Sequence, residues 1–379
     1  MTNTVDIVVS GHLCLDLLPR MEHVPLEGLA KPGRLYEVGA LDISTGGAVS
    51  NTGLALHKLG VSVRLMATVG DDLLGRVIVG ILAAREPSLA EHIEVQQGQS
   101  SSYTIVLSPE KVDRIFLHSP STNTDFGADN INFELMRDAR LFHFGYPPIL
   151  PRVIANDGDE LEKIYRLARE TGVITSLDTS LPDPKGLSGQ ANWHTILTRT
   201  LPYVDIFMPS IEEILFMLRR EDYEAWRGAL GAHLTADYLH TLAAELLAMG
   251  PAIVGFKLGE MGLYIRTGKA AKIERLRQRL PIGLEAWTDK RVWSPAFYVS
   301  VVGTTGAGDP AFAGLLSSLL KGLKPQEAVK WACAVGACNV ESADAVSGVR
   351  TWADTEARMR AGWPARSEHI SGLKQEMSL

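Results

Sequence analysis

The chain has 379 residues, of which 46% are apolar and 21% charged, and its formal net charge is -7. This composition is typical of a soluble globular protein, and the negative charge disfavours an electrostatic site for nucleic acid. The three cysteines, Cys14, Cys333 and Cys338, lack the spacing of a metal site or a disulfide framework. No apolar segment approaches the length of a membrane span, so we expect a cytoplasmic protein that binds no membrane.

Apolar runs that predict strands alternate along the chain with helical patterns. The predicted strands are 6–10, 63–69, 141–145, 173–178, 206–209, 252–257 and 299–302. The predicted helices include 159–171, 234–249 and 325–341. This alternation is typical of βαβ units, so the sequence predicts an α/β fold with a mostly parallel sheet that helices cover on both faces.

The first glycine-rich segment is Gly46-Gly47-Ala48-Val49-Ser50-Asn51, which leads into a helical pattern over 52–59. Glycines at such a turn let a ligand lie against the backbone. Asn51 has two interpretations. It is either the N-cap of the helix or a hydrogen-bonding group for a vicinal diol, since its amide both donates and accepts.

The second segment, Gly303-Thr304-Thr305-Gly306-Ala307-Gly308-Asp309, follows the predicted strand 299–302 and precedes another helical pattern. Such a turn exposes N–H groups at the positive end of a helix, which favours an anion such as phosphate. An acid beside that anion is explained if it accepts the proton of a hydroxyl that attacks the phosphate. The alternative is that the glycines only turn the chain and Asp309 caps the helix.

Together the two segments resemble the paired motifs of the ribokinase-like (phosphofructokinase-B) family of carbohydrate kinases. Further family-like segments stand in the expected order at 7–16, 69–75, 207–213 and 255–262, so the resemblance covers most of the chain. It implies a three-layer αβα ribokinase-like fold, with a mostly parallel central sheet and a small β lid, in a single domain over 1–379. The stretches 17–43 and 95–119 correspond to the lid, whose closure would exclude water.

The resemblance implies ATP-dependent phosphorylation of a hydroxyl on a small sugar or sugar derivative. Asp309 would be the catalytic base, and the amides of Gly306, Ala307 and Gly308 would stabilise charge on the phosphates. The other implied site residues are Asp16, Gly46, Gly47 and Asn51 for the sugar, Thr304, Gly259, Gly262 and Asn339 for the nucleotide, and Glu213 for Mg²⁺ through water. The family also leaves open a monovalent cation and a homodimer through the lid strands.

Several residues depart from the family pattern and keep alternatives open. Gly303 stands where many relatives have Asp, and Ser210 replaces an Asn near the metal. A non-catalytic sugar-binding regulatory protein is therefore one alternative. A nucleoside kinase of the same fold is another, because Tyr36, Tyr103 and Phe116 in the lid could stack on a base.

Three segments look peculiar to this chain. The stretch 181–200 predicts a surface excursion, and 219–235 predicts an exposed helix. The stretch 268–294 carries seven basic residues and leads toward the phosphate loop, so it either contacts the nucleotide or forms a solvated charged face. Lys257 likewise either contacts phosphate or ends a strand with its amine in solvent.

Overall fold

The strands of the chain form two sheets in the computed structural model, which describes residues 5–21, 24–29, 32–109, 114–303, 306–366 and 370–373. The central sheet has the order β13-β12-β11-β10-β9-β8-β1-β4-β5. Its strands are β1 (Ile7–Gly11), β4 (Val63–Gly70), β5 (Ile93–Gln96), β8 (Leu141–Gly145), β9 (Ile174–Asp178), β10 (Ile206–Phe207), β11 (Ile253–Lys257), β12 (Leu263–Thr267) and β13 (Arg291–Ser294).

The central sheet is mostly parallel, as the alternation of strand and helix patterns predicts. Every neighbouring pair from β5 to β11 is parallel, while β12 and β13 are antiparallel additions at one edge. The carboxyl ends of parallel strands lie along the same end of a sheet. The residues that follow β1, β8, β9, β10 and β11 are therefore brought together.

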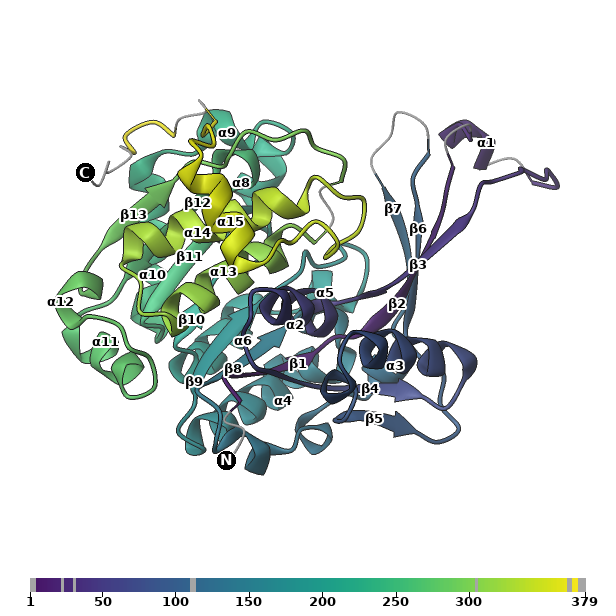
Figure 1. Cartoon of the computed structure of the whole chain (residues 1–379), viewed down its shortest axis with the longest axis horizontal. Helices are drawn as coiled ribbons and strands as arrows, with labels where there is room; N and C mark the ends of the chain where they lie inside the picture. Colours follow the sequence, from purple (N-terminus) through teal and green to yellow (C-terminus); the bar gives the residue numbers. More distant parts are fainter. Residues whose placement is uncertain are drawn as a thin grey trace.

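Helices cover both faces of the central sheet and bury two separate apolar cores (Figure 1). Ile7 and Val9 of β1 point into one core and Val8 points into the other, as expected of a strand that is buried on both sides. The first core is completed by α2 (Ala48–Lys58), α3 (Leu73–Arg85), α11 (Ala270–Arg277), α12 (Leu284–Trp287), α13 (Gly308–Leu320) and α14 (Pro325–Asn339). The second is completed by α4 (Pro151–Glu170), α6 (Trp193–Thr200), α7 (Ile211–Leu218) and α10 (Ala236–Met249).

The remaining helices are α5 (Leu187–Gln190), α8 (Arg220–Trp226), α9 (Leu230–His233) and α15 (Trp352–Arg360), together with α1 (Leu26–Leu29), which lies apart from these layers (Figure 1). Within the part of the chain that the structure describes, no helix is both long and apolar enough to cross a bilayer.

The second sheet is the small β lid, which projects from one side of the body (Figure 1). It has the order β3-β2-β6-β7, with β2 (Cys14–Pro19), β3 (Leu41–Gly46), β6 (Tyr103–Leu107) and β7 (Ile115–Ser119). At its root Cys14 pairs with Gly46, and Asp16 pairs with Ser44. The lid therefore begins directly at the first glycine-rich segment.

Two predictions of local structure are wrong. The segment 299–302 forms no strand: Val301 and Val302 are more than half exposed, and the N–H of Val302 donates to the carbonyl of Val340 behind α14. The sheet ends instead with β13, inside the segment that the sequence indicated as an insert. The surface excursion predicted over 181–200 is wrong for its second half, because Trp193 of α6 is buried in the core shared with α4.

Candidate active site

The carboxylate of Asp309 lies at the start of α13 and accepts three side-chain hydrogen bonds. Asn51 Nδ2 donates to Oδ2 at 3.0 Å, and Thr52 Oγ1 donates to Oδ1 at 3.2 Å, both from α2. The hydroxyl of Tyr146, which follows β8, donates to Oδ2 at 2.5 Å. Asp309 is 1% exposed, and this burial raises its pKa, although Lys257 and the three donors act in the opposite direction.

The two glycine-rich segments therefore meet in space, 258 residues apart in the chain. Asn51 lies inside α2, whose N-cap is Gly47, so the alternative that Asn51 caps the helix is wrong. The alternative that Asp309 only caps its helix is also inconsistent with the structure, since Asp309 lies within the first turn of α13 and accepts its bonds from other elements.

A buried ion pair lies beside Asp309 at the carboxyl ends of β9 and β11. Lys257 Nζ contacts Asp178 Oδ1 at 2.6 Å, and both side chains are nearly inaccessible to water. The interpretation that the Lys257 amine ends in solvent is therefore wrong. Burial acts to lower the pKa of Lys257, but Asp178, Glu213 and Asp309 together raise it, so the amine stays protonated. A methyl group built on Gly308 would lie 3.1 Å from this amine, which places the positive charge against the predicted phosphate loop.

Glu213 lies in the first turn of α7 and faces the same edge of the sheet. Its Oε2 accepts a hydrogen bond from Thr179 Oγ1 at 2.7 Å and one from the N–H of Ser210 at 2.8 Å. Ser210 Oγ in turn accepts the N–H of Glu213, which completes a capping box. Ser210 thus keeps a structural role at the position where the family has an Asn, and it holds the carboxylate of Glu213 in place.

The four residues predicted to bind sugar gather at the root of the lid. Asp16 is partly buried, and desolvation raises its pKa to about 6 although hydrogen bonds from Cys14 and Thr104 act to lower it. A Cβ on Gly46 would lie 2.2 Å from Asp16 Oδ2, so only glycine permits this approach. Gly47 has φ of 86° and lies against His12, with room for no side chain.

His12 joins this group although the sequence reasoning missed it. It follows β1, is 2% exposed, and finds no hydrogen-bond partner for either ring nitrogen among the described residues. Burial, and secondarily His118, hold its pKa well below the usual range, so the ring is neutral. Its ring lies 5.0 Å from that of His118 on β7 and 6.3 Å from that of Tyr146. The Oδ1 of Asn51 is also buried without a partner.

Tyr146 and Thr52 were missed as well. Tyr146 follows directly after the predicted strand 141–145, and the carboxyl ends of parallel strands are where such sheets bind ligands. This position in the sequence could have indicated Tyr146 as a site residue. Thr52 follows Asn51 on a buried helix, and nothing in its local sequence distinguishes it from a packed residue.

Of the residues predicted to bind the nucleotide, Gly259, Gly262 and Asn339 lie within the described part of the chain, as does the glycine turn that leads into α13. Gly306 adopts φ of 68°, and Gly306, Ala307 and Gly308 form the turn into the helix. Gly259 and Gly262 lie in the turn between β11 and β12, and Gly259 is two residues beyond Lys257. Asn339 ends α14 and is fully buried, and neither polar atom of its side-chain amide has a hydrogen-bond partner within the described ranges. Thr304 lies outside the described residues.

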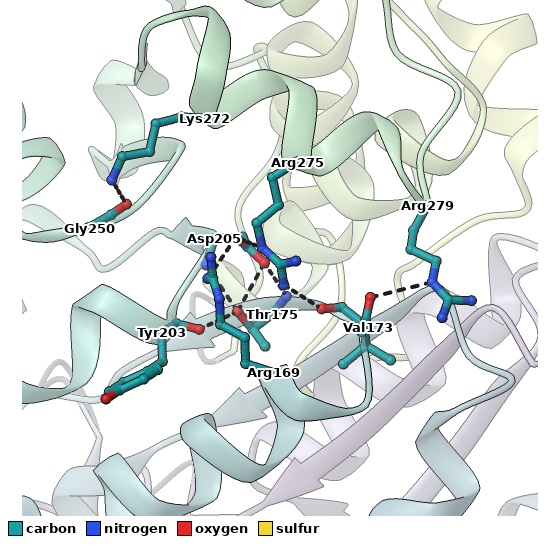
Figure 2. Close-up of polar contacts among 10 residues, drawn as sticks. Arg169, Val173, Thr175, Tyr203, Asp205, Gly250, Lys272, Arg275 and Arg279 are labelled. Atoms are coloured by element: carbon teal, nitrogen blue, oxygen red, sulfur yellow. Dashed lines mark hydrogen bonds and ion pairs between the residues drawn. The ribbon is translucent and has the colours of Figure 1, made fainter.

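Within the basic segment 268–294, Arg275 and Arg279 lie at the amino ends of β9 and β10, opposite the candidate site. Arg275 Nε donates to Asp205 Oδ1 at 2.9 Å, and Arg169 from α4 donates to the same oxygen at 3.1 Å (Figure 2). Asp205 precedes β10, and Arg275 also donates to the carbonyl of Val173, which precedes β9. The hypothesis that this segment contacts the nucleotide is therefore wrong for Arg275 and for Arg279, which donates to the carbonyl of Gly172.

Residues 5–352 match the pfkB family of carbohydrate kinases. The chain is 28% identical over 297 residues to a protein of Archaeoglobus fulgidus named an uncharacterized sugar kinase, covering 78% of this chain and 98% of that protein. It is 23% identical over 365 residues to fructokinase-2 of Solanum lycopersicum, covering 94% and 96%.

Solved structures agree with this match at the level of the fold. The ribokinase of Arabidopsis thaliana complexed with ribose and ATP superimposes with a TM-score of 0.68, at 16% identity, over 93% of this chain and 98% of that one. The central sheet and lid are those of the ribokinase-like fold. The chain therefore belongs to the pfkB family of carbohydrate kinases, a family of phosphotransferases.

Proposed function

We propose that this protein transfers the terminal phosphoryl group of ATP to a hydroxyl of a small uncharged sugar or polyol, with Asp309 as the base. The observation that carries the proposal is the buried carboxylate of Asp309, fixed by Asn51, Thr52 and Tyr146 at the start of α13. In the reaction Asp309 accepts the hydroxyl proton as the oxygen bonds to the γ-phosphorus, and the bond to the departing ADP breaks.

The phosphate end of the site combines backbone and side-chain charge. The turn of Gly306, Ala307 and Gly308 directs N–H groups toward the space before α13, where the helix dipole also favours negative charge. The Lys257 amine lies against Gly308 and stays protonated. We assign both groups to stabilising charge that grows on the phosphates during transfer.

The residues at this edge suit a magnesium ion held partly by water and phosphate. Mg²⁺ in such sites takes one or two carboxylates and keeps several waters, so it needs no dense protein cage. The described residues contain no cluster of three or more metal-ligating side chains. Glu213 and Asp178, whose Oδ2 is buried without a partner, are the carboxylates that would hold the ion. When bound, it would neutralise charge on the phosphate oxygens.

The acceptor end of the site favours a neutral polyol. Asp16, the Oδ1 of Asn51 and one nitrogen of His12 accept hydrogen bonds, and the other nitrogen of His12 donates one. Several hydroxyl groups on adjacent carbons match this set. The aromatic faces of His12 and Tyr146 suit the C–H groups of such a molecule.

The nucleoside alternative depends on Tyr36, Tyr103 and Phe116. Phe116 is 52% exposed on β7, and among the described residues no ring contact joins these three side chains. The matched relatives are named a sugar kinase and a fructokinase, and this similarity favours a sugar over a nucleoside as the acceptor.

A coupled assay of ADP release across a panel of sugars and nucleosides tests the proposal. Asp309→Asn should lower kcat by roughly 10²–10⁴-fold while sugar binding, measured by calorimetry, persists. Glu274→Gln on the exposed face of α11 is the matched control and should leave kcat unchanged. Sugar binding without turnover in the wild type would support the non-catalytic regulatory alternative instead.

We also propose a homodimer through the lid. Leu41 and Ile43 on the outer strand β3 and Phe116 and Leu117 on the outer strand β7 are each about half exposed. Exposed apolar edge strands favour pairing with a second chain.

A cytoplasmic location and the absence of a nucleic-acid partner stay predictions from the sequence.

A further inference from the structure

Tyr146 is held in an unusual backbone conformation at the edge of the active site. It has φ of 69° and ψ of 46°, the left-handed region that residues with a side chain rarely adopt. Its N–H donates to the carbonyl of Asp178 at 3.2 Å, and Pro147 and Pro148 follow it. Residues in such conformations persist when the surrounding structure fixes them, and they cluster at functional sites. The turn directs the phenol toward Asp309.

The hydrogen bonds to Asp309 are divided unequally between its two oxygens. An ionised carboxylate offers about four acceptor positions, two on each oxygen. Tyr146 and Asn51 fill both positions on Oδ2, whereas Oδ1 accepts one bond from the described part of the chain, that of Thr52. One position on Oδ1 is therefore left for the hydroxyl of an acceptor.

We propose that Oδ1 is the atom of Asp309 that takes the proton, and that Tyr146 is a positioning residue that fixes the carboxylate by holding Oδ2. The inference rests on the proposed function; it adds Tyr146, which lies outside the motif around Asp309, and it specifies the oxygen of Asp309 that takes the proton. Tyr146 acts through Asp309 and stays protonated throughout, because burial and the neighbouring carboxylates raise its pKa.

The charges around Asp309 set the direction of the expected pH effect. The groups that face it are Lys257 of β11, Asp178 of β9, Glu213 of α7, the phenol after β8, and the neutral Asn51 and Thr52 of α2. A donor to a carboxylate stabilises its ionised form. Loss of the phenol hydroxyl therefore raises the pKa of Asp309, so more of the base is protonated at a given pH.

Kinetics of Tyr146→Phe test the proposal. We expect kcat to fall by about 10- to 100-fold, the acceptor KM to change by less than about threefold, and the acidic limb of the kcat profile to move up by about one pH unit. Tyr165→Phe is the matched control, because its buried hydroxyl donates to the carbonyl of Ser176 at 2.8 Å away from the base. That control should leave kcat and the profile unchanged.

Two kinetic outcomes would overturn the proposal. A large rise in the acceptor KM with unchanged kcat would mean that the phenol binds the acceptor directly. A fall in KM with unchanged or increased kcat would mean that it occupies the position of the acceptor hydroxyl. In both cases Tyr146 would have a role other than positioning.

A titration that needs no turnover separates this proposal from the proposed function. Asp side chains labelled with ¹³C at the carboxyl carbon report their own pKa by NMR, and Asp309→Asn identifies the resonance of Asp309. Tyr146→Phe should raise that pKa by about one unit even if no sugar is phosphorylated. An unchanged titration refutes the hydrogen bond to Asp309, whereas a raised pKa in an enzyme without turnover refutes only the kinase proposal.

Discussion

Removal of the Asp205 carboxylate should destabilise the fold without touching the active site. The side chain of Asp205 is 4% exposed and holds Arg169 and Arg275, which are 31% and 21% exposed (Figure 2). Its Oδ2 also accepts the N–H of Thr175 at 3.0 Å. Asp205→Ala leaves two guanidinium groups facing each other and a buried N–H without its acceptor.

The expected cost follows from the burial of these groups. Breaking a fully buried ion pair costs about 3–5 kcal/mol, and the partial exposure of both arginines reduces this to about 2–4 kcal/mol. For a chain of this length the melting temperature should fall by about 3–5 °C. Urea denaturation followed by circular dichroism measures the free energy of unfolding directly.

Glu274→Ala provides the comparison for Asp205→Ala. It breaks the Arg277–Glu274 pair on the same helix α11, but both side chains are about half exposed. That variant should cost less than about 0.5 kcal/mol. Salt should partly restore Asp205→Ala, since it screens the repulsion between the two arginines. Equal losses of stability in the two variants would refute the argument that α11 is anchored by a buried charge.

Two further predictions concern the acceptor site and the lid. Burial raises the pKa of Asp16 to about 6, so its protonation should raise the acceptor KM as the pH falls below about 6. The variant Asp16→Asn should remove this pH dependence. A KM that stays constant from pH 5 to 8 in the wild type would contradict the assignment of Asp16. Ile43→Lys places a charge at a half-exposed position of the outer strand β3, so light scattering should show a monomer in place of a dimer. A wild-type protein that is already monomeric would contradict the lid interface.

The raised pKa of Asp16 also makes the stability of the fold depend on pH. Its pKa in the folded protein exceeds the value of about 3.8 in an exposed carboxyl, so the folded state binds the proton more tightly than the unfolded chain. The contribution of Asp16 to stability is therefore greatest below about pH 4 and declines as the pH rises through about 6.

The periodic elements and the glycine-rich turns could be predicted from sequence because local patterns specify them. The runs over 141–145 and 252–257 are continuous apolar strands between helices, and they appear as β8 and β11 within a residue of the expected bounds. The segment 299–302 misled the prediction because its valines favour β structure in isolation, whereas in the fold the N–H of Val302 donates to the carbonyl of Val340 rather than to a neighbouring strand.

The site was predictable in its motifs and unpredictable in its long-range contacts. Asp309, Gly47 and Asn51 belong to recognisable glycine-rich motifs, so their types and spacing indicate a ligand. The partners Tyr146, His12 and Lys257 lie on strand ends far apart in the chain, and only the register of the parallel sheet brings them together. Nothing local predicts that a tyrosine before two prolines donates to an acid 163 residues later.

The pairing of Cys14 with Gly46 and of Asp16 with Ser44 restricts where the lid can bend. The same backbone ladder that joins β2 to β3 keeps the Asp16 carboxylate against Gly46, so a hinge at this root would separate the residues that we propose to bind the sugar. Any flexing during substrate entry and product exit must then occur farther out along the hairpin. Substitutions in its outer half would thus alter the rates of entry and exit while leaving the choice of sugar intact.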